Sequence, residues 1–461
     1  MTQRTLYFHT SLVTLGLLLH SCASLPKALA PSAQDSLAIP KRYDASAYPI
    51  PEIRTSLLKV FPDPQLKQLI STALKNNPNL KASAASLEEA GFNTRRSYAT
   101  LTPTLSANSS ASRNSSNPTG FGRATNESYS SSLDARWEVD LWGRIKAGVT
   151  AASNDLAAAN ADYATARQSI AAQSAQAYFS LLQANSQLDL AQRRLHSFEK
   201  SYELINRRFE TGTSDLGALD LARTDIETTR AQIAQRTDRR DQAARSLTTL
   251  TGAYPRATLS ITSWPSLQRS VPANLPSSLL LQRPDIDAAY QRLRATDSRV
   301  TVAHRDLYPD FTLTASFGTQ SSTLKKLADS NFNAWSLLAN LSAPLIDGGA
   351  RRSELGASSA RAKRALANYQ STVLNAFREV ENALGSEHYL QQQYSATSSA
   401  LKAAKSAETR ALRNYDSGLI SVLDYLQIQR RTFTTEEALI NIRAQRYQNR
   451  VSLALALGKA F

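Results

Sequence analysis

The sequence predicts a mainly α-helical chain built from two copies of one unit, with a β-hairpin inserted in each copy. Three observations predict this class. Marker residues of the two halves share a constant offset of 206 positions. Segments of strict apolar–polar alternation indicate strands, and apolar residues at seven-residue spacing indicate very long helices. The offset relates Pro103 to Pro309, Gly143 to Gly349, Phe209 to Tyr415, Gly212 to Gly418 and Gly252 to Gly458.

This shared offset indicates an internal duplication, because it runs without a gap through glycines and prolines that lie far apart. The period is far longer than the roughly 20 to 50 residues of solenoid repeats, so each copy is a large unit. The sequence therefore divides into a signal peptide at 1–21, an extended arm at 22–62, a first repeat at 63–252, a connection at 253–279 and a second repeat at 280–461.

The N-terminus has the character of a secretory signal peptide. Arg4 supplies the positive start, and residues 11–19 form the apolar centre. The motif from Leu19 to Cys22 resembles a bacterial lipobox, and the following Ala23 is typical of sorting to the outer membrane. Cys22 is the one cysteine of the chain, which excludes an intrachain disulfide and CxxC metal sites. We expect lipid attachment at Cys22; the alternative is an ordinary signal peptide beside an unmodified cysteine.

The composition excludes several classes of function. The chain has 461 residues, 42% of them hydrophobic, and a formal net charge of +15. Its lysines and arginines are scattered and accompany no nucleic-acid-binding motif, so the charge indicates solvated helix faces and no nucleic-acid partner. His196, His304 and His388 lie far apart without ligand spacing, and no phosphate-binding loop is present. We therefore expect no enzyme, no cofactor and no metal site.

The first repeat begins with a helix over about 63–98, which is interrupted at Pro78, a residue tolerated in a first helical turn. A β-hairpin at 101–139 follows, and apolar residues alternate with polar and charged ones along 129–139. Residues 108–126 are rich in Ser, Asn and Gly, so they are expected to form a long loop between the strands.

A helical hairpin at 143–250 completes the first repeat. Its first helix, 143–210, would be roughly 100 Å long at about 1.5 Å per residue. Apolar residues every seven positions give this helix a coiled-coil seam, which consists of Leu181, Leu188, Leu195, Tyr202 and Phe209. Gly212 then marks the helix end, and a serine marks the next start. A helix of this length cannot be buried in a monomeric domain of this size, so we expect it to line an elongated assembly.

The second repeat has the same order: a helix from residue 280, a β-hairpin at 308–346 and a helical hairpin at 349–458. Beyond the signal peptide there is no run of about 18 apolar residues, so no transmembrane helix is predicted. Any membrane-spanning part must then be a closed β-barrel. Four strands cannot close one, because membrane barrels start at about eight; two, three or four chains would supply about 8, 12 or 16.

Several motifs occur in the order found in the TolC-like outer membrane efflux family and resemble its lipid-anchored branch. They are Trp137–Arg144, Leu280–Ile286, Tyr308–Gly318, Pro344–Gly349 and Gly418–Arg430. The resemblance covers about residues 50–461. It implies a homotrimer in which each protomer gives four strands to a 12-stranded outer-membrane β-barrel, continued by a long periplasmic α-helical barrel.

The resemblance also implies a function. The chain would be the exit duct of a tripartite efflux system, conducting drugs or other small solutes passively from an inner-membrane pump and a periplasmic adaptor to the outside. Its expected partners are two further copies, the adaptor, the pump and outer membrane lipid. Two alternatives stay open: the outer membrane duct of a type I protein secretion system, and a periplasmic coiled-coil scaffold, which the alternating strands oppose.

The resemblance places a periplasmic gate at the helix turns. Asp424 lies where the family commonly has a carboxylate that narrows the pore and favours cations. The second acidic position of the family falls on Gln427, which is not a carboxylate. Asp215 and Asp220 are expected to contribute from the first repeat. The alternative for all three carboxylates is stabilisation of helix N-termini.

The same turns resemble the adaptor-docking motif of the family. The expected docking residues are Gly212, Thr213 and Ser214 in the first repeat, and Gly418, Leu419 and Ser421 in the second. The alternative is that these residues only end one helix and begin the next.

Overall fold

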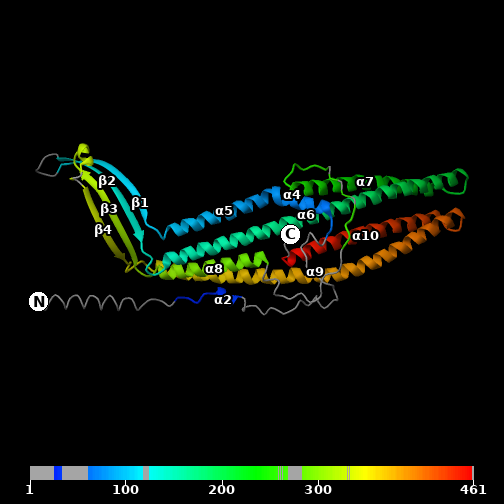
Figure 1. The fold of residues 1–461 in the computed structure, drawn as a ribbon. Helices are drawn as coiled ribbons and strands as arrows, with labels where there is room; N and C mark the ends of the chain where they lie inside the picture. Colours follow the sequence, from blue (N-terminus) through cyan, green and yellow to red (C-terminus); the bar gives the residue numbers. More distant parts are fainter. Residues whose placement is uncertain are drawn as a thin grey trace. The chain divides into compact units, whose positions relative to one another are not determined.

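The structure is a computed structural model, and it describes residues 25–33, 61–117, 124–257, 259, 261, 263–267, 283–329, 331 and 333–458. These residues are mainly helical, with one antiparallel sheet (Figure 1). The helices are α2 (Ala30–Ala33), α4 (Pro64–Asn76), α5 (Pro78–Ala99), α6 (Arg144–Glu210), α7 (Leu216–Leu250), α8 (Pro284–Arg305), α9 (Ala350–Asp416) and α10 (Val422–Ala456), with the 3-10 helix η4 (Leu324–Ala328). The strands are β1 (Thr104–Ser116), β2 (Ala124–Glu138), β3 (Asp310–Ser321) and β4 (Asn333–Ser342).

The two repeats fold in the same way. α6 and α9 have 67 residues each, α7 and α10 have 35, and α5 and α8 have 22. Each of these helices in the second repeat begins 206 positions after its counterpart in the first. The offset predicted from glycines and prolines is therefore confirmed at the level of whole helices.

The chain divides into two compact units, and each is described by itself. The first unit consists of Met1–Leu37, Ser86–Asn160 and Ala288–Gln370, and it contains the sheet. The second unit consists of Ala38–Ala85, Ala161–Asp287 and Ser371–Phe461, and it contains α7 and α10. Among the described residues, no helix has an apolar stretch long enough to cross a lipid bilayer.

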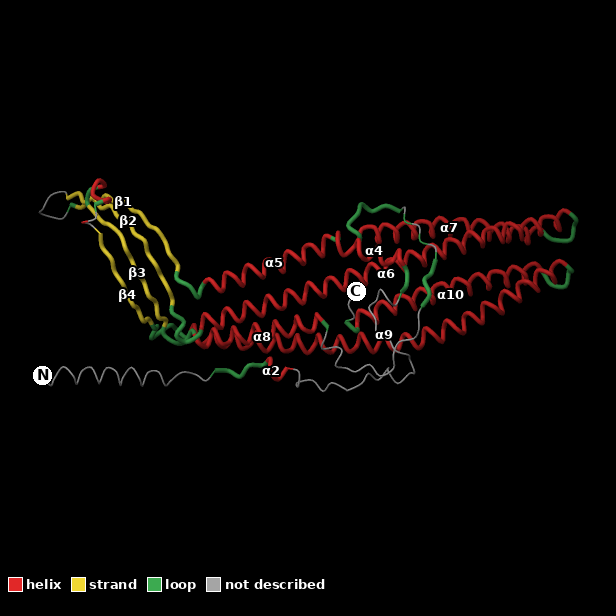
Figure 2. The backbone as a smooth tube through the Cα atoms, in the orientation of Figure 1, coloured by secondary structure: helices red, strands yellow, loops and turns green. Residues whose placement is uncertain are grey.

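The four strands of the first unit form one sheet in the order β1-β2-β3-β4 (Figure 2). β2 of the first repeat pairs with β3 of the second, which places Leu133 opposite Phe317. The two hairpins are therefore joined side by side, and β1 and β4 form the edges of the sheet.

One face of this sheet is apolar and the other is polar. Leu133, Phe317 and Trp335 lie in register on one face, and Trp335 is 78% exposed. The opposite face carries hydroxyl and amide side chains around Asp134, whose carboxylate accepts hydrogen bonds from Asn108 at 2.7 Å and from two serines. An exposed apolar face of this kind is stabilised by contact with an apolar environment. The two open edges are stabilised by pairing with further strands.

The long loop expected at 108–126 is wrong, because β1 continues to Ser116 and β2 already begins at Ala124. Serine and asparagine are poor strand formers by themselves. Here their side chains bond across the hairpin: the Ser109 hydroxyl donates to the Ser130 carbonyl at 3.4 Å, and the Ser110 and Ser130 hydroxyls lie 2.8 Å apart. Pairing between the strands therefore overrides local propensity.

The core of the second unit is an aromatic cluster between helices and the connection that follows α7. The Phe179 ring lies 4.9 Å from the rings of both Phe61 and Tyr447, and the Trp264 ring lies 5.0 Å from Tyr447. Phe179 is fully buried. Aromatic rings at such distances add to the stabilisation from burial, so the proline-rich connection is fixed against the helices at Trp264.

The C-terminal ends of α7 and α10 are held in the same way in both repeats. The Asn77 amide donates to the Leu250 carbonyl at 2.9 Å. Arg283, 206 positions later, donates from its guanidinium to the Ala456 carbonyl at 2.8 Å. Both bonds satisfy a carbonyl that has no partner inside its own helix. The duplication therefore preserves the contact although the side chain differs.

Candidate functional site at the helix turns

Two tight turns join the long helices, one in each repeat. In the first turn, the Gly212 N–H donates to the carbonyl three residues earlier at 2.9 Å, and the Thr213 N–H donates to the carbonyl five residues earlier at 2.8 Å. In the second turn, Gly418 and Leu419 make the same bonds at 3.0 and 2.8 Å. The glycines have φ angles of 74° and 73°. This is the Schellman motif, which ends a helix through a left-handed glycine.

The helix after each turn begins with a side-chain cap. Asp215 caps α7, and its carboxylate accepts a hydrogen bond from the Ala218 N–H at 2.8 Å. The equivalent residue of the second repeat is Ser421, which caps α10 together with Asp424 in a capping box. The Asp424 N–H donates to the Ser421 hydroxyl oxygen at 3.2 Å, and the Ser421 N–H donates to the Asp424 carboxylate at 3.3 Å. Asp215 and Asp424 therefore both stabilise helix starts.

The three carboxylates expected at a gate occupy three different positions of the repeat. Asp424 lies three residues after its N-cap, where the first repeat has Ala218. Asp220 lies five residues after its own N-cap, where the second repeat has the buried Leu426. Asp424, Asp215 and Asp220 are all exposed. The duplication therefore does not make them equivalent.

Arg208 links the two turns. Its guanidinium donates to the Asp416 carbonyl at 2.7 Å and lies 4.2 Å from the centre of the Tyr415 ring. Tyr415 in turn stacks on Tyr425 at a centroid distance of 5.6 Å. Burial raises the pKa of Tyr415 and of Tyr425, so both phenols remain protonated at neutral pH. A cation–π contact and a hydrogen bond thus hold the end of α6 against the end of α9.

A buried polar network lies behind the turns, between α6 and α10. The Gln429 side chain is fully buried, and its amide donates to the hydroxyls of Ser197 at 2.9 Å and Ser201 at 3.1 Å. The Ser201 hydroxyl also lies 3.2 Å from the Tyr425 hydroxyl. A satisfied network of this kind fixes the register of two packed helices, because any slip would leave polar groups buried without partners.

A bidentate ion pair connects the two helical hairpins. Arg430 on α10 donates from Nε and Nη2 to both carboxylate oxygens of Asp225 on α7, at distances of 3.0, 3.0 and 2.7 Å. Asp225 is 8% exposed. Bidentate pairs of this kind are strong and geometrically specific. Arg236 on α7 forms a second ion pair with Glu437 on α10.

No pattern in the sequence predicted the pair of Asp225 and Arg430. The two residues are 205 positions apart, one short of the repeat offset, so the duplication does not relate them. Both lie in helices with many charged residues, where a single charge gives no signal. The pair becomes visible only when the two repeats are packed together.

Leucine side chains are exposed at and beside the turns. Leu419 is 73% exposed, Leu423 is 59% exposed and Leu216 is 58% exposed. A Cβ atom added at Gly212 or Gly418 would have no neighbour within 4 Å, so the surface over both glycines is open. Exposed apolar residues on an open tip are typical of a protein-binding surface.

The residues expected at the turns thus lie in two groups, 212–220 and 418–424, whereas Cys22 lies outside the described residues. Within the ranges that the structure describes, no group of three or more His, Cys, Asp or Glu side chains could hold a metal ion. The turns present capped helix starts, exposed carboxylates and exposed leucines. This arrangement suits the mouth of a pore or a contact with a partner.

Comparison with known proteins identifies the family of the chain. The family model described as "Outer membrane efflux protein" matches the chain twice, at residues 69–253 and 275–459, two ranges that again start 206 positions apart. The chain is 33% identical over 402 residues to the cation efflux system protein CusC of Escherichia coli O6:H1 (strain CFT073), with 86% of each chain covered. It is 30% identical over 401 residues to the probable outer membrane lipoprotein SilC of Salmonella typhimurium, again with 86% of each covered.

A solved structure extends the likeness to three dimensions. A crystal structure of CusC, from work on its folding and transmembrane channel formation, matches with a TM-score of 0.86 and 30% identity, and the match covers 95% of this chain and all of that one. The family model covers most of both repeats, and the curated relatives span nearly the whole chain. The chain therefore belongs to the outer membrane efflux protein family and is an efflux channel of the outer membrane.

Proposed function

We propose that three copies of this chain form one channel, in which each copy gives four strands to a 12-stranded β-barrel and its long helices to a periplasmic α-helical tunnel. The sheet carries this proposal, because it has one exposed apolar face, one polar face and two open edges. Pairing β1 of one copy with β4 of the next would satisfy both edges. The apolar face would then contact lipid, and the polar face would line a water-filled lumen.

The number of copies follows from the width of the lumen. Two copies would supply about eight strands, and side chains fill the interior of a barrel of that size. Three copies supply about 12, which leaves a water-filled passage. The family resemblance favours three over four.

The turns at Gly212 and Gly418 are proposed to form the periplasmic end of the tunnel. There they would meet a periplasmic adaptor that connects the channel to an inner-membrane pump. The exposed Leu216, Leu419 and Leu423 and the open surface over the glycines support this role. Asp424, with Asp215 and Asp220, would narrow the tunnel with negative charge and favour cations.

The cargo is proposed to be small solutes, such as drugs or metal cations, that pass without chemical change. CusC is by name part of a cation efflux system, and carboxylates at the turns suit the passage of cations. Cys22 is proposed to carry the lipid anchor, in agreement with the description of SilC as a lipoprotein.

Arginine substitutions on the two faces of the sheet test whether the apolar face contacts lipid and the polar face lines the lumen. Leu337 lies on the apolar face of β4, and its neighbour Ser336 lies on the polar face. Leu337→Arg should strongly reduce the channel recovered from the outer membrane, because arginine in the middle of the lipid face costs about 2–4 kcal/mol. Ser336→Arg should leave assembly intact and change only the conductance.

The measurements are the mass of the detergent-solubilised protein and its single-channel conductance in planar bilayers. The unmodified protein should have the mass of three chains and conduct ions. A monomer without conductance, or equal tolerance of both arginines, would contradict the proposal.

A further inference from the structure

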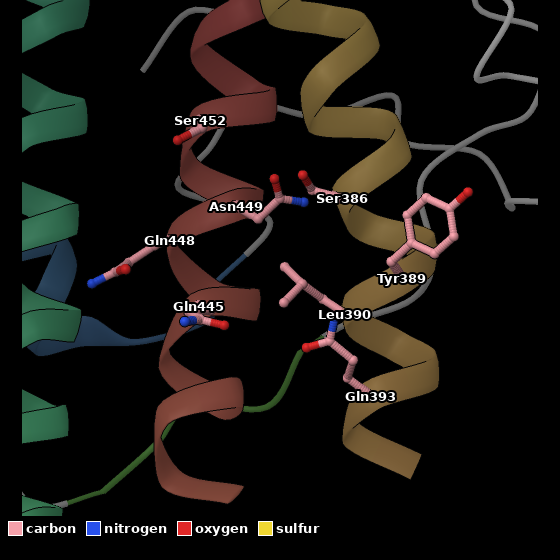
Figure 3. A pocket seen from close by; sticks show the side chains of 8 residues that line it. All are labelled: Ser386, Tyr389, Leu390, Gln393, Gln445, Gln448, Asn449 and Ser452. Atoms are coloured by element: carbon pink, nitrogen blue, oxygen red, sulfur yellow. The ribbon is translucent and has the colours of Figure 1, made fainter. Parts of the chain in front are cut away.

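Charged side chains line a small cavity in the second unit. A larger groove of about 420 Å³ between α9 and α10 has uncharged lining residues, and Figure 3 shows two of them, Ser386 and Asn449, pointing toward one another across it. The small cavity, of about 20 Å³, lies between α6, α7 and α10, and Arg194, Arg236 and Glu437 belong to its lining. About 10–15 Å³ suffices for one water molecule, so this cavity has room for one particle of similar size.

The two carboxylates that attract Arg194 are already bound to other arginines. These carboxylates belong to Glu437 and Asp225. Arg236 donates to the Glu437 carboxylate and also to the side-chain oxygen of Gln187. The Asp225 carboxylate is bound by the bidentate guanidinium of Arg430, at distances of 2.7–3.0 Å.

The guanidinium of Arg194 is packed against aromatic rings and makes few polar contacts. It lies 5.1 Å from the centre of the Phe198 ring and 5.9 Å from that of the Phe433 ring. Nη1 donates to the side-chain oxygen of Gln232 at 3.4 Å, and Nε is buried with no hydrogen-bond partner in the described part of the chain. Aromatic rings stabilise a cation but accept none of its five N–H groups in ordinary hydrogen bonds.

The charge of Arg194 therefore lacks a counter-charge of its own. Burial lowers the pKa of Arg194, and repulsion from Arg430 and Arg236 adds to this effect, while Asp225 and Glu437 oppose it. Arginine nevertheless stays protonated in proteins, so the charge remains. The lining has two cationic residues and one anionic residue, which leaves a net charge of +1. A partly buried charge of this kind is stabilised by an ion of opposite sign.

The helical hairpin by itself does not explain why these polar side chains are present. In the second repeat, the positions that correspond to Arg194, Gln232 and Arg236 hold two alanines and an isoleucine. α9 and α10 nevertheless have the same lengths as α6 and α7. A hairpin of this size thus forms without the two guanidinium groups and the amide.

We propose that the cavity between α6, α7 and α10 binds one small monovalent anion of the halide class, such as chloride. The anion would lie against the Arg194 guanidinium and balance the net positive charge of the lining. The amide nitrogen of Gln232, whose oxygen accepts from Arg194, would be a further donor. Glu437 does not exclude the anion, because Arg236 compensates its charge. The site lies within one chain, so the proposal does not depend on the number of copies in the channel.

Bromide locates the site directly, because it is similar to chloride in size and charge and scatters X-rays anomalously. Crystals of the full chain soaked in sodium bromide should show an anomalous peak beside the Arg194 guanidinium in every copy. A cavity that contains only water in these crystals, or no density, would overturn the proposal.

Thermal unfolding of the detergent-solubilised full chain provides a second test. An anion that binds the folded state stabilises it by mass action, so replacing sodium gluconate by sodium chloride should raise the Tm. Gluconate is too large for the cavity, and constant ionic strength keeps the screening of surface ion pairs the same. Bromide should raise the Tm as chloride does.

Two variants connect this shift with the cavity. Arg194→Met removes the charge and keeps a long unbranched side chain, so the shift in Tm between gluconate and chloride should be lost. Arg193→Gln is the matched control, because Arg193 is the preceding residue, is exposed and pairs with Asp189 and Glu436. This variant should keep the full shift.

The outcomes decide between a bound anion and a general effect of salt. An equal shift in Arg194→Met and in the unmodified protein would show that the anion acts elsewhere, and would overturn the proposal. If Arg194→Met does not fold, the bromide peak in crystals of the unmodified protein decides.

Discussion

At the scale of single residues, the carboxylates of the turns have a structural role, and an electrostatic role is proposed for them. Asp424 accepts hydrogen bonds from the Ser421 backbone and hydroxyl at the start of α10, yet it is exposed. Asp215 caps α7 in a similar way. Truncation to alanine would remove cap and charge together, so the two roles must be separated by substitutions that keep a hydrogen-bond acceptor.

Asp424→Asn separates the two roles. The side-chain carbonyl of asparagine can still accept the hydrogen bond from the Ser421 N–H, so the capping box should be retained while the charge is lost. If Asp424 contributes to a cation-attracting constriction, the substitution should weaken block by divalent cations or raise single-channel conductance. Asp424→Ala removes the charge and the capping-box hydrogen bond together and serves as the comparison. Unchanged conductance and block in Asp424→Asn would count against a role in the gate.

Two substitutions of Gly418 separate the effect of charge from the effect of side-chain shape at the proposed docking surface. Its φ angle of 73° disfavours most side chains, but asparagine and aspartate tolerate this region comparatively well. Gly418→Asp and Gly418→Asn have nearly the same shape and differ in charge. The aspartate variant should lose efflux while assembly continues, and the asparagine variant should retain more efflux. The tolerance of cells to drugs or metals measures efflux, and the mass of the detergent-solubilised protein measures assembly. Equal tolerance for both variants would refute docking at this turn.

At the scale of elements, the helices of the second unit are held by ionic contacts as well as by the aromatic core. Arg430 and Asp225 join α10 to α7 close behind the turns. Arg450 and Glu387 form a buried pair at 2.6 Å between α10 and α9. Because the first pair connects the two helical hairpins, it restrains any motion that would separate the turns.

Arg430→Gln should therefore loosen the packing at the turns, which are proposed to form the periplasmic end of the channel. The bidentate pair is lost and the mostly buried Asp225 carboxylate loses its partner, which favours separation of α7 from α10. We expect higher single-channel conductance and increased entry of large antibiotics into cells. Arg431→Gln is the matched control, because Arg431 is the next residue and is exposed. Equal conductance in the two variants would show that the pair does not restrain the channel.

The carboxyl of Glu408 on α9 makes the stability of the fold depend on pH. Burial raises the pKa of Glu408 above its ordinary value of 4.5, and Glu436 adds to this, while the Thr432 hydroxyl and Lys405 oppose it. A raised pKa in the folded state means that the ionised side chain destabilises the fold. This loss is absent below pH 4.5 and complete above the raised pKa.

Glu408→Gln should accordingly raise the Tm at neutral pH and leave it unchanged below pH 4.5. Glu354→Gln is a control of opposite sign, because hydrogen bonds from Arg361 and Ser358 lower the pKa of Glu354. That substitution removes stability at neutral pH, and the difference disappears as the pH falls through the lowered pKa. Thermal unfolding at both pH values measures the two effects; equal Tm changes at the two pH values would contradict them.

Most elements could be predicted from local pattern, but their lengths and pairings could not. Alternation along 129–139 and the glycines after each long helix located strands and turns close to where the structure has them. The serine-rich ends of β1 and β2 were missed because a hydroxyl favours a strand only when a second strand stands opposite it, as Ser130 does for Ser110. The pairing of β2 with β3 depends on contacts between the repeats, which no local pattern encodes.

At the scale of the whole molecule, the duplication was the strongest information in the sequence. It required only that glycines and prolines recur at one offset, and helix lengths, turns and terminal contacts follow the same offset in the structure. The duplication could not reveal contacts between residues that the repeat offset does not relate, such as the contact of Asp225 with Arg430. These depend on how one repeat is seated on the other.

The lipid anchor proposed at Cys22 supplies a prediction at this scale. Cys22→Ser should abolish incorporation of labelled palmitate into the protein. The four strands lie between Thr104 and Ser342, so the variant should still assemble when an ordinary signal peptide exports it across the inner membrane. Unchanged lipid incorporation would contradict attachment at Cys22.

The ion pairs between α7 and α10 affect how the mouth of the proposed three-copy tunnel would open. Within one chain, Asp225 bonds to Arg430 and Arg236 to Glu437. The repeat offset of 206 relates Asp225 and Arg430 to Arg431 and Thr224, and it relates Arg236 and Glu437 to Ile442 and Ala231. Neither of these corresponding pairs can form an ion pair. Contacts that contain an ion pair would therefore alternate with contacts that lack one around the mouth of the proposed three-copy tunnel. Such a mouth would widen first between neighbouring chains, with threefold rather than sixfold symmetry.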